Sequence, residues 1–210
     1  MTDLYKYPRT FHVPWSREKD GDDKILHSME HFVGKNVVVT EKRDGENSTI
    51  YSSGYFHARS LDGNVHPSQG WLKGNFAKWF YQLPGGWRVC GENLYATHAI
   101  EYSDLDTFFE VFSIWTEKNE CLSWDEMELF CKEWGLKVVP VLYRGVYDEE
   151  KIKASYRPGS EGYVIRTEEG FHFNSFSENI AKYVRIGHVG ADTENWRQRW
   201  DNTKVNSLKK

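Results

Sequence analysis

Short runs of β-branched and aromatic residues recur along the chain and predict many strands with few helices between them. Strands are expected at residues 36–40, 48–51, 55–59, 87–92, 108–115, 138–143, 162–167, 171–173 and 181–185. Helical spacing of apolar residues predicts helices at 24–32, 68–82, 125–134 and 149–156. No regular strand–helix–strand rhythm is present. The pattern therefore predicts an α+β fold with largely antiparallel sheets.

Length and composition fit one domain, or one domain with a short appendage. The chain has 210 residues and is rich in aromatic side chains, with 9 Trp, 12 Tyr and 12 Phe, enough to build a core. No apolar run approaches the roughly 18 residues of a membrane helix, so no membrane partner is expected. The three cysteines are odd in number and lack metal-binding spacing, which favours reduced thiols and a cytoplasmic location.

Charge is unevenly distributed, although the net charge is only −4. That net charge argues against a broad, non-specific grip on nucleic acid. The segment 101–128 is strongly acidic, whereas 179–210 is mostly basic and carries Trp196 and Trp200. Solvated faces and a phosphate-binding tail are equally good interpretations of this asymmetry.

The most informative stretch runs from Glu41 to Asn47, between two predicted strands. Lys42 ends the first strand, and the Asp44-Gly45 dipeptide predicts a tight turn from which the chain returns as a hairpin. An ordinary surface turn explains this stretch alone equally well, because Asp-Gly is common in turns. Partners for a reactive lysine must therefore come from elsewhere in the chain.

Such partners occur as short motifs in a fixed order. They are Lys42-Arg43-Asp44-Gly45, Gly91-Glu92-Asn93-Leu94-Tyr95, Phe108-Phe109-Glu110-Val111-Phe112-Ser113-Ile114, Glu161-Gly162-Tyr163-Val164-Ile165 and Ala181-Lys182-Tyr183-Val184-Arg185. The series resembles the successive motifs of the covalent nucleotidyltransferases, which are ATP-dependent RNA ligases, DNA ligases and mRNA capping enzymes. The likeness is greatest to RNA ligases of the nick-sealing phage type and spans about residues 37–185.

The resemblance implies that Lys42 attacks the α-phosphate of ATP, expels pyrophosphate and holds AMP through a phosphoramidate. The attacking lysine must be a neutral amine, so its pKa has to fall below the free value of about 10.4. Burial or a nearby cation would lower that pKa. Lys182 resembles such a cation and would also neutralise the phosphates.

The resemblance assigns further roles by position. Glu161 would belong to a site for Mg²⁺ or Mn²⁺, which prefer oxygen ligands. The remaining residues would hold the nucleotide: Glu41 the adenine amine, Phe112 the base, Arg59 and Glu92 the phosphate and ribose, and Asn47 the phosphate during sealing. Each also has an ordinary structural interpretation, as a strand-end charge or, for Phe112, a core side chain.

Two features depart from the family pattern. A second lysine often follows the first by two residues in the last motif, but here that site is Val184, with Arg185 beside it. Successive strand residues point to opposite faces, so Arg185 should face away from the position of the second lysine. Whether Arg185 replaces the phosphate contact of that lysine is therefore an open question. Only residues 186–210 follow, so we expect a catalytic domain over 1–187 and a short tail over 188–210, without an OB-fold.

The sequence thus predicts an ATP-dependent RNA ligase acting on RNA with 5′-phosphate and 3′-hydroxyl ends. An end-processing kinase or phosphatase is an expected partner. One alternative is an ATP-dependent DNA ligase. Another is a catalytically silent nucleic-acid-binding domain, although such a domain has no need for all of Lys42, Glu92, Glu161 and Lys182. The basic tail is expected to help hold the RNA strand.

Overall fold

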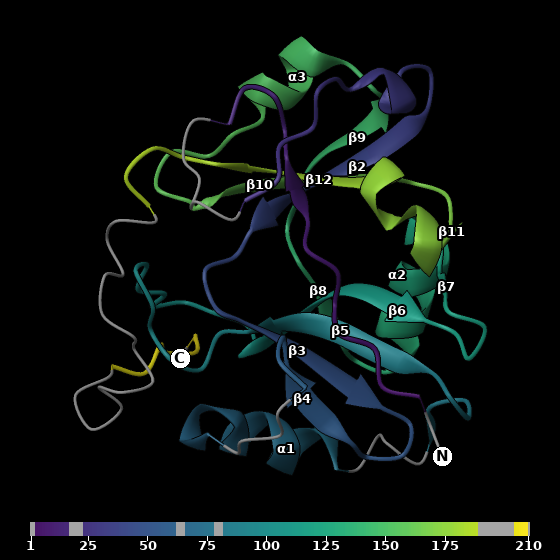
Figure 1. Ribbon diagram of the computed structural model, residues 1–210. Helices are drawn as coiled ribbons and strands as arrows, with labels where there is room; N and C mark the ends of the chain where they lie inside the picture. Colours follow the sequence, from purple (N-terminus) through teal and green to yellow (C-terminus); the bar gives the residue numbers. More distant parts are fainter. Residues whose placement is uncertain (1–2, 17–22, 62–65, 78–81, 189–203, 210) are drawn as a thin grey trace.

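Two sheets form the body of the protein in the computed structural model, which describes residues 3–16, 23–61, 66–77, 82–188 and 204–209 (Figure 1). The smaller sheet has five strands in the order β1 (Phe11–His12), β12 (Ile180–Val184), β10 (Gly162–Thr167), β2 (Asn36–Lys42) and β9 (Val141–Val146). All its pairs are antiparallel except β1 with β12.

The larger sheet lies beside it and is also mainly antiparallel. Its strand order is β11 (Phe171–His172), β7 (Glu120–Cys121), β6 (Phe109–Trp115), β5 (Arg88–Asn93), β3 (Glu46–Tyr51) and β4 (Phe56–Ala58). A short strand, β8 (Lys137–Val138), adds to β6 in parallel. The predicted α+β fold with largely antiparallel sheets is confirmed.

Three α-helices and three 3₁₀ turns lie among the described residues. The helices are α1 (Gly70–Phe76), α2 (Trp124–Glu133) and α3 (Glu149–Ala154), and the 3₁₀ turns are Glu30–Phe32, Pro67–Gln69 and Phe173–Glu178. A capping box of Ser123 and Glu126 starts α2, and Gly135 follows its end with a positive φ of 65°. None of the helices described is long and apolar enough to cross a membrane.

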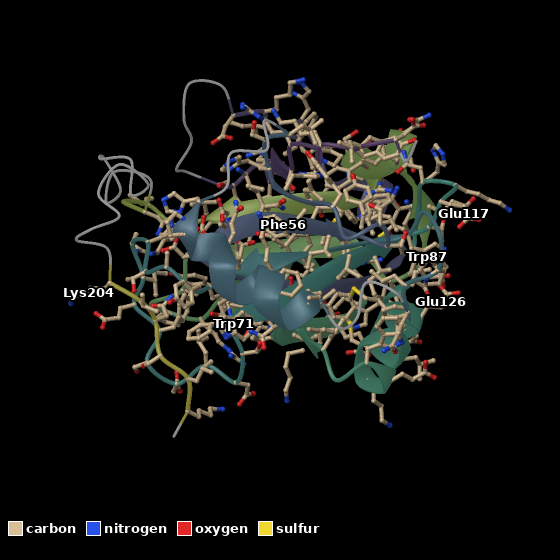
Figure 2. The ribbon with its side chains drawn as sticks, turned by 90° about the horizontal axis from the view of Figure 1, so that it is seen from below. Phe56, Trp71, Trp87, Glu117, Glu126 and Lys204 are labelled. Carbon is tan, nitrogen blue, oxygen red and sulfur yellow. The ribbon has the colours of Figure 1, made fainter. Side chains whose placement is uncertain are left out.

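Both faces of the larger sheet are packed. One face is covered by α1 and α2, whose Leu72, Trp124 and Met127 are fully buried in the main core; Figure 2 shows α1 crossing the sheet. The other face packs against the smaller sheet, with Cys90 in one cluster with Val164. The two sheets therefore pack against each other, and residues at this junction can come from both.

Two predicted elements are wrong. The expected helix at 24–32 is only the 3₁₀ turn Glu30–Phe32, because the chain before it is extended and Ile25 pairs with His12. The expected strand 138–143 is split at Pro140, which has no N–H for a ladder. Its halves join different sheets, as β8 and β9. Of the helix expected at 68–82, α1 forms part, and residues 78–81 lie outside the described residues.

The hairpin expected around Lys42 is also wrong, and the correction matters for the site. β2 pairs with β9 and β10, whereas β3 pairs with β4 and β5. The turn Arg43-Asp44-Gly45 therefore leads from one sheet to the other. Lys42 is the last residue of its strand and so lies at the junction of the two sheets.

Candidate active site

Lys42 faces a carboxylate at the end of the neighbouring strand. Its Nζ lies 2.7 Å from Oε1 of Glu161, and the lysine side chain is 25% exposed, so that it remains reachable from solvent. The pairing register explains this proximity, because Lys42 lies opposite Gly162, the residue after Glu161.

Gly162 is required by close packing at this point. A Cβ atom built on Gly162 would lie 1.9 Å from the carbonyl oxygen of Tyr183, far inside van der Waals contact. Only glycine lets β12 approach β10 beside the nucleophile candidate. The motif glycine thus sets the position of Glu161 through backbone packing.

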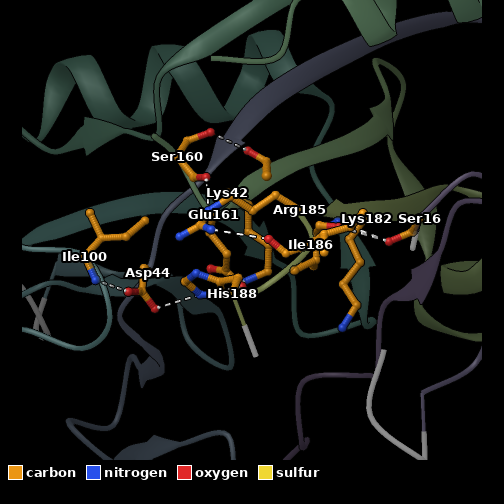
Figure 3. A network of polar contacts seen from close by, with 12 residues as sticks. Ser16, Lys42, Asp44, Ile100, Ser160, Glu161, Lys182, Arg185, Ile186 and His188 are labelled. Atoms are coloured by element: carbon orange, nitrogen blue, oxygen red, sulfur yellow. Dashed lines mark hydrogen bonds and ion pairs between the residues drawn. The ribbon is translucent and has the colours of Figure 1, made fainter. Parts of the chain in front are cut away.

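The turn after Lys42 is anchored by its side chains. Oδ2 of Asp44 accepts a hydrogen bond from the backbone N–H of Ile100 at 2.6 Å (Figure 3). The Asp44 N–H donates to the Tyr102 hydroxyl at 3.0 Å. Arg43 donates to both carboxylate oxygens of Glu110, at 2.7 and 3.1 Å. The backbone on either side of the turn is therefore held to β6 and to the segment after β5.

His188 is a site residue that sequence reasoning missed. Its Nε2 lies 3.4 Å from Oδ1 of Asp44 and 3.5 Å from Oε1 of Glu161 (Figure 3). All three residues are buried, and one possible ligand atom of each lies within 4.8 Å of the others. The sequence offered no sign of this contact beyond the closeness of His188 to the last motif.

Carboxylates dominate the electrostatics around Lys42. Burial alone would lower the pKa of Lys42, but the charges of Glu161 and Glu92 and, to a smaller extent, Asp44 outweigh it and raise that pKa. Burial, together with Glu161 and Asp44, raises the pKa of Glu92 to about 8 against the opposing effect of Lys42. The lysine is accordingly an ammonium ion, and the expected lowering of its pKa by Lys182 is not found.

Lys182 shares a sheet face with Lys42. It lies opposite Val164, which lies opposite Thr40, two residues before Lys42. Its Nζ is 3.4 Å from Oδ1 of Asp23. Burial and the charge of Lys42 lower the pKa of Lys182, although Asp23 opposes them. The same Asp23 lies 3.0 Å from Nε2 of His12.

Four of the predicted nucleotide contacts come from the larger sheet and its edge. Asn47 lies opposite Glu92, which lies opposite Glu110, so all three share one face. Oδ1 of Asn47 is buried and has no hydrogen-bond partner among the described residues. Phe112 is half-buried, and its ring centroid is 5.2 Å from that of Tyr7. Arg59 follows β4 and is exposed, within reach of the charges of Arg9 and Asp23.

Glu41 and Arg185 are placed differently. Glu41 precedes Lys42 on β2 and pairs with Tyr163, on the opposite face. Its carboxylate oxygens accept from Arg43 at 2.8 Å and Arg157 at 3.5 Å. The Arg185 guanidinium donates to the backbone carbonyl of Ser160, the residue before Glu161, at 3.1 Å.

A cavity of about 530 Å³ lies elsewhere and is lined by Pro14, Trp15, Lys153, Tyr156, Tyr163, Tyr183 and Ile186. Tyr163 alternates with Gly162 along β10, so the cavity lies on the sheet face opposite to that of Lys42. The chemistry-bearing residues are not in this cavity.

Comparison with known proteins gives one family. Residues 35–184 match the family model described as RNA ligase. The structure resembles an archaeal ATP-dependent RNA ligase, with a TM-score of 0.58 and 20% identity, over 86% of this chain and 48% of that chain. It also resembles the Naegleria gruberi RNA ligase with PPi, with a TM-score of 0.56 and 18% identity, over 77% of this chain and 53% of that one.

A lysine-to-alanine variant of the Naegleria gruberi ligase with ATP and Mn gives similar values, with a TM-score of 0.56 and 16% identity, over 80% of this chain and 54% of that one. No curated protein matches the sequence. The chain thus spans about half the length of these solved chains. At this level of identity the structural likeness establishes the fold, and the sequence match establishes the family.

Proposed function

The chain belongs to the RNA ligase family, and from this premise we propose that it is an ATP-dependent RNA ligase with Lys42 as its nucleophile. The observation that carries the proposal is the placement of Lys42. It ends β2 at the junction of two sheets, is 25% exposed, and lies 2.7 Å from Glu161. Asp44 and Glu92 act on it electrostatically, and Lys182 shares its sheet face.

The proposed reaction has three steps. In the first, neutral Nζ of Lys42 attacks the α-phosphorus of ATP, a P–N bond forms, and pyrophosphate leaves with the electrons of the broken P–O bond, while the lysine nitrogen releases one proton to solvent. In the second, a 5′-phosphate of RNA displaces the lysine and takes the adenylyl group. In the third, a 3′-hydroxyl attacks that activated phosphate, AMP leaves, and a phosphodiester bond remains.

We assign most of the nucleotide contacts to the sheet faces that carry Lys42 and Glu92. Lys182 and Arg59 supply positive charge for phosphate oxygens, and Glu92 accepts hydrogen bonds from the ribose. The buried, unpartnered Oδ1 of Asn47 needs a donor, which a ribose hydroxyl can provide, while the amide nitrogen of Asn47 can donate to phosphate. Phe112 covers one face of the base. Glu41 is proposed to accept from the adenine amine, for which its longer bond to Arg157 at 3.5 Å must yield.

The residues present fit a divalent cation of the Mg²⁺ or Mn²⁺ type. Glu161 and Asp44 offer carboxylate oxygens, and the His188 imidazole lies within 4.8 Å of both. A bound cation would neutralise charge that develops on the α-phosphate. Glu161, whose charge raises the pKa of Lys42, would then no longer hold a proton on the lysine.

The experiment that tests the proposed function follows one labelled phosphate through all steps. Wild-type protein is incubated with α-labelled ATP and Mg²⁺, run on a denaturing gel, and then chased with nicked, 5′-phosphorylated RNA. We expect label on the protein, then on the RNA 5′ end, and finally as free AMP once the strands join. A protein that never takes label would contradict the proposal and leave the silent nucleic-acid-binding domain as the better interpretation.

The same assay separates the polynucleotide classes. Matched nicked duplexes carry RNA or DNA on the 3′-hydroxyl side and are compared at equal concentration. Faster joining with RNA is expected for an RNA ligase, and faster joining with DNA would favour the alternative. We propose that a kinase or phosphatase partner prepares the RNA ends.

A further inference from the structure

The C-terminal strap, residues 204–209, is bound along the segment 94–106 that follows β5. Backbone hydrogen bonds join them from Thr97 N–H to Lys204 O at 2.9 Å and from Leu105 N–H to Ser207 O at 3.1 Å. Val205 also pairs with Ala96, and Leu208 with Leu105. Figure 1 shows the yellow C-terminal end lying beside this teal segment.

Asn206 is the buried centre of the strap and is 3% exposed. Its Nδ2 donates to the carbonyls of Leu94 at 2.8 Å and Ala96 at 3.3 Å. Its Oδ1 accepts from the Thr97 hydroxyl at 2.9 Å and the Tyr102 N–H at 2.8 Å. The amide uses its donors and both acceptor sites, and it ties the two arms of the 94–106 segment together.

The tied segment bears directly on the turn after Lys42. The Tyr102 hydroxyl accepts from the Asp44 N–H at 3.0 Å, and the Ile100 N–H donates to Oδ2 of Asp44 at 2.6 Å. The guanidinium of Arg43 lies 5.0 Å from the centroid of the Tyr102 ring. Asn206 thus holds the backbone N–H of Tyr102, and the hydroxyl of the same tyrosine holds Asp44, two positions after Lys42.

We propose that Asn206 is a positioning residue for the nucleophile, holding Lys42 at the angle that attack on ATP requires. The inference rests on the proposed function and deepens it. It also changes the role expected of the tail, because the end of the tail is placed to support the first chemical step and not only to hold RNA. Attack at phosphorus depends steeply on alignment, and a misplacement of about 1 Å costs up to about 100-fold in rate.

The test measures single-turnover formation of lysyl-AMP in full-length Asn206→Ala. We expect the maximum rate to fall by about 10-fold to 100-fold, with little change in the ATP concentration giving half the maximum. Joining of RNA that is already adenylylated does not use Lys42 as nucleophile and should fall less. Ser207→Ala is the matched control, since it removes one exposed hydrogen bond to Ser103 from the same strap; it should behave as wild type.

Tyr102→Phe provides a second variant that keeps the ring and removes only the hydroxyl bound by Asp44. It should reproduce the rate loss, and its combination with Asn206→Ala should lose less than the two losses multiplied, because both act through one series of contacts. If Asn206→Ala does not fold, Tyr102→Phe decides the question. A wild-type rate in Tyr102→Phe, or equal losses in lysyl-AMP formation and joining for folded Asn206→Ala, would overturn the proposal.

Hydrogen exchange keeps this inference separate from the proposed function. The amides of Ile100 and Asp44 should exchange faster in Asn206→Ala than in wild type or Ser207→Ala, whether or not ATP reacts. Absence of label on wild-type protein, with this faster exchange present, would defeat the proposed function alone. Unchanged exchange at both amides would defeat the positioning role even in an active ligase.

Discussion

At the scale of single residues, the neighbours of Lys42 favour its protonated form, and an ammonium group is not a nucleophile. The carboxylates of Glu161, Glu92 and Asp44 raise its pKa against the effect of burial. Lys182, by contrast, has a lowered pKa, although the two side chains are similarly exposed at 25% and 17%. Differences in their reactivity should therefore reflect protonation more than access.

This contrast predicts the order of acylation in the absence of nucleotide and metal. At a given pH, a raised pKa leaves less neutral amine, so Lys42 should react with an acetylating reagent more slowly than Lys182. Glu161→Gln should make Lys42 react several-fold faster, since a neutral amide no longer favours the ammonium form. Peptide mapping by mass spectrometry, at values from about pH 7 to about pH 10, follows the acetylation of both lysines. Faster reaction of Lys42 than of Lys182 in wild type would contradict the electrostatic account.

Glu92 yields a prediction about stability. Its pKa in the folded protein is about 8, against an ordinary value of 4.5. The folded state therefore binds more protons than the unfolded state between these values, and stability falls as the pH rises through this window. Glu92→Gln should remove that loss and raise the free energy of unfolding by about 2 kcal/mol at pH 8.

Urea unfolding of wild type and Glu92→Gln at pH 5 and pH 8, roughly either end of the window, measures the effect. The gain should be largest at the higher pH and nearly absent at the lower. The variant is also expected to form lysyl-AMP poorly, because the ribose loses a carboxylate acceptor. Destabilisation of equal size at both pH values would show that Glu92 makes a favourable structural contact that outweighs its charge.

Single residues were predicted from the sequence where a motif fixed them in order. Lys42, Glu161, Glu92 and Asp44 lie close enough to influence one another's pKa values, while the catalytic roles implied for Lys42, Glu161 and Glu92 stay predictions. His188 could not be found, because its contact with Asp44 and Glu161 depends on the path of the chain after β12. The pKa of Lys42 was expected in the wrong direction, since local sequence does not show how many carboxylates converge on it.

At the scale of elements, the pairing of β10 with its two neighbours fixes the distance between Lys42 and Glu161. Gly162 lies opposite Lys42 on one side and Val184 on the other. The carbonyl of Tyr183 occupies the space of a Cβ atom at this residue. Any side chain here must push β12 away and disturb the position of Lys182 as well as Glu161.

Gly162→Ala should therefore lower stability by about 3 kcal/mol, and any folded fraction should form lysyl-AMP poorly. Gly74→Ala, in the exposed middle of α1, is the matched control, since a Cβ there meets no atom within 4 Å. That change should raise stability by about 0.5–1 kcal/mol. Thermal and urea unfolding compare the two. Gly162→Ala with wild-type stability would show that β12 moves freely and does not fix the site.

Strands with strong apolar patterns were predictable, and β10 has the bounds expected from sequence. Which strands pair was not predictable from local pattern. Asp-Gly between two strands favours a hairpin, but long-range pairing sends β2 and β3 to different sheets. Pro140 likewise breaks a continuous apolar run into β8 and β9, and tertiary packing then assigns each half to its own sheet.

At the scale of the whole molecule, residues 204–209 of the expected tail pack against the expected catalytic domain. Asn206 is buried. Of the basic residues expected to contact RNA, Lys204 and Lys209 form ion pairs with Glu101 and Asp106 of the domain. The other residues expected to contact RNA lie outside the described residues: Trp196, Arg197, Arg199, Trp200 and Lys210. The division into 1–187 and 188–210 stays a prediction. Because His188 contacts Asp44 and Glu161, removal of everything after Gly187 should impair lysyl-AMP formation, and not RNA binding alone.

The central claim is that ATP modifies this protein on Lys42, and mass spectrometry tests it most directly. Wild-type protein is incubated with ATP and Mg²⁺, digested under conditions that preserve phosphoramidates, and mapped for an adenylyl group. Lys35→Ala, which removes an exposed lysine just before β2, serves as the matched control for Lys42→Ala. We expect one adenylyl group on Lys42 in wild type and Lys35→Ala, and none in Lys42→Ala. An adenylyl group on another residue, or its persistence in folded Lys42→Ala, would contradict the assignment of Lys42 as nucleophile.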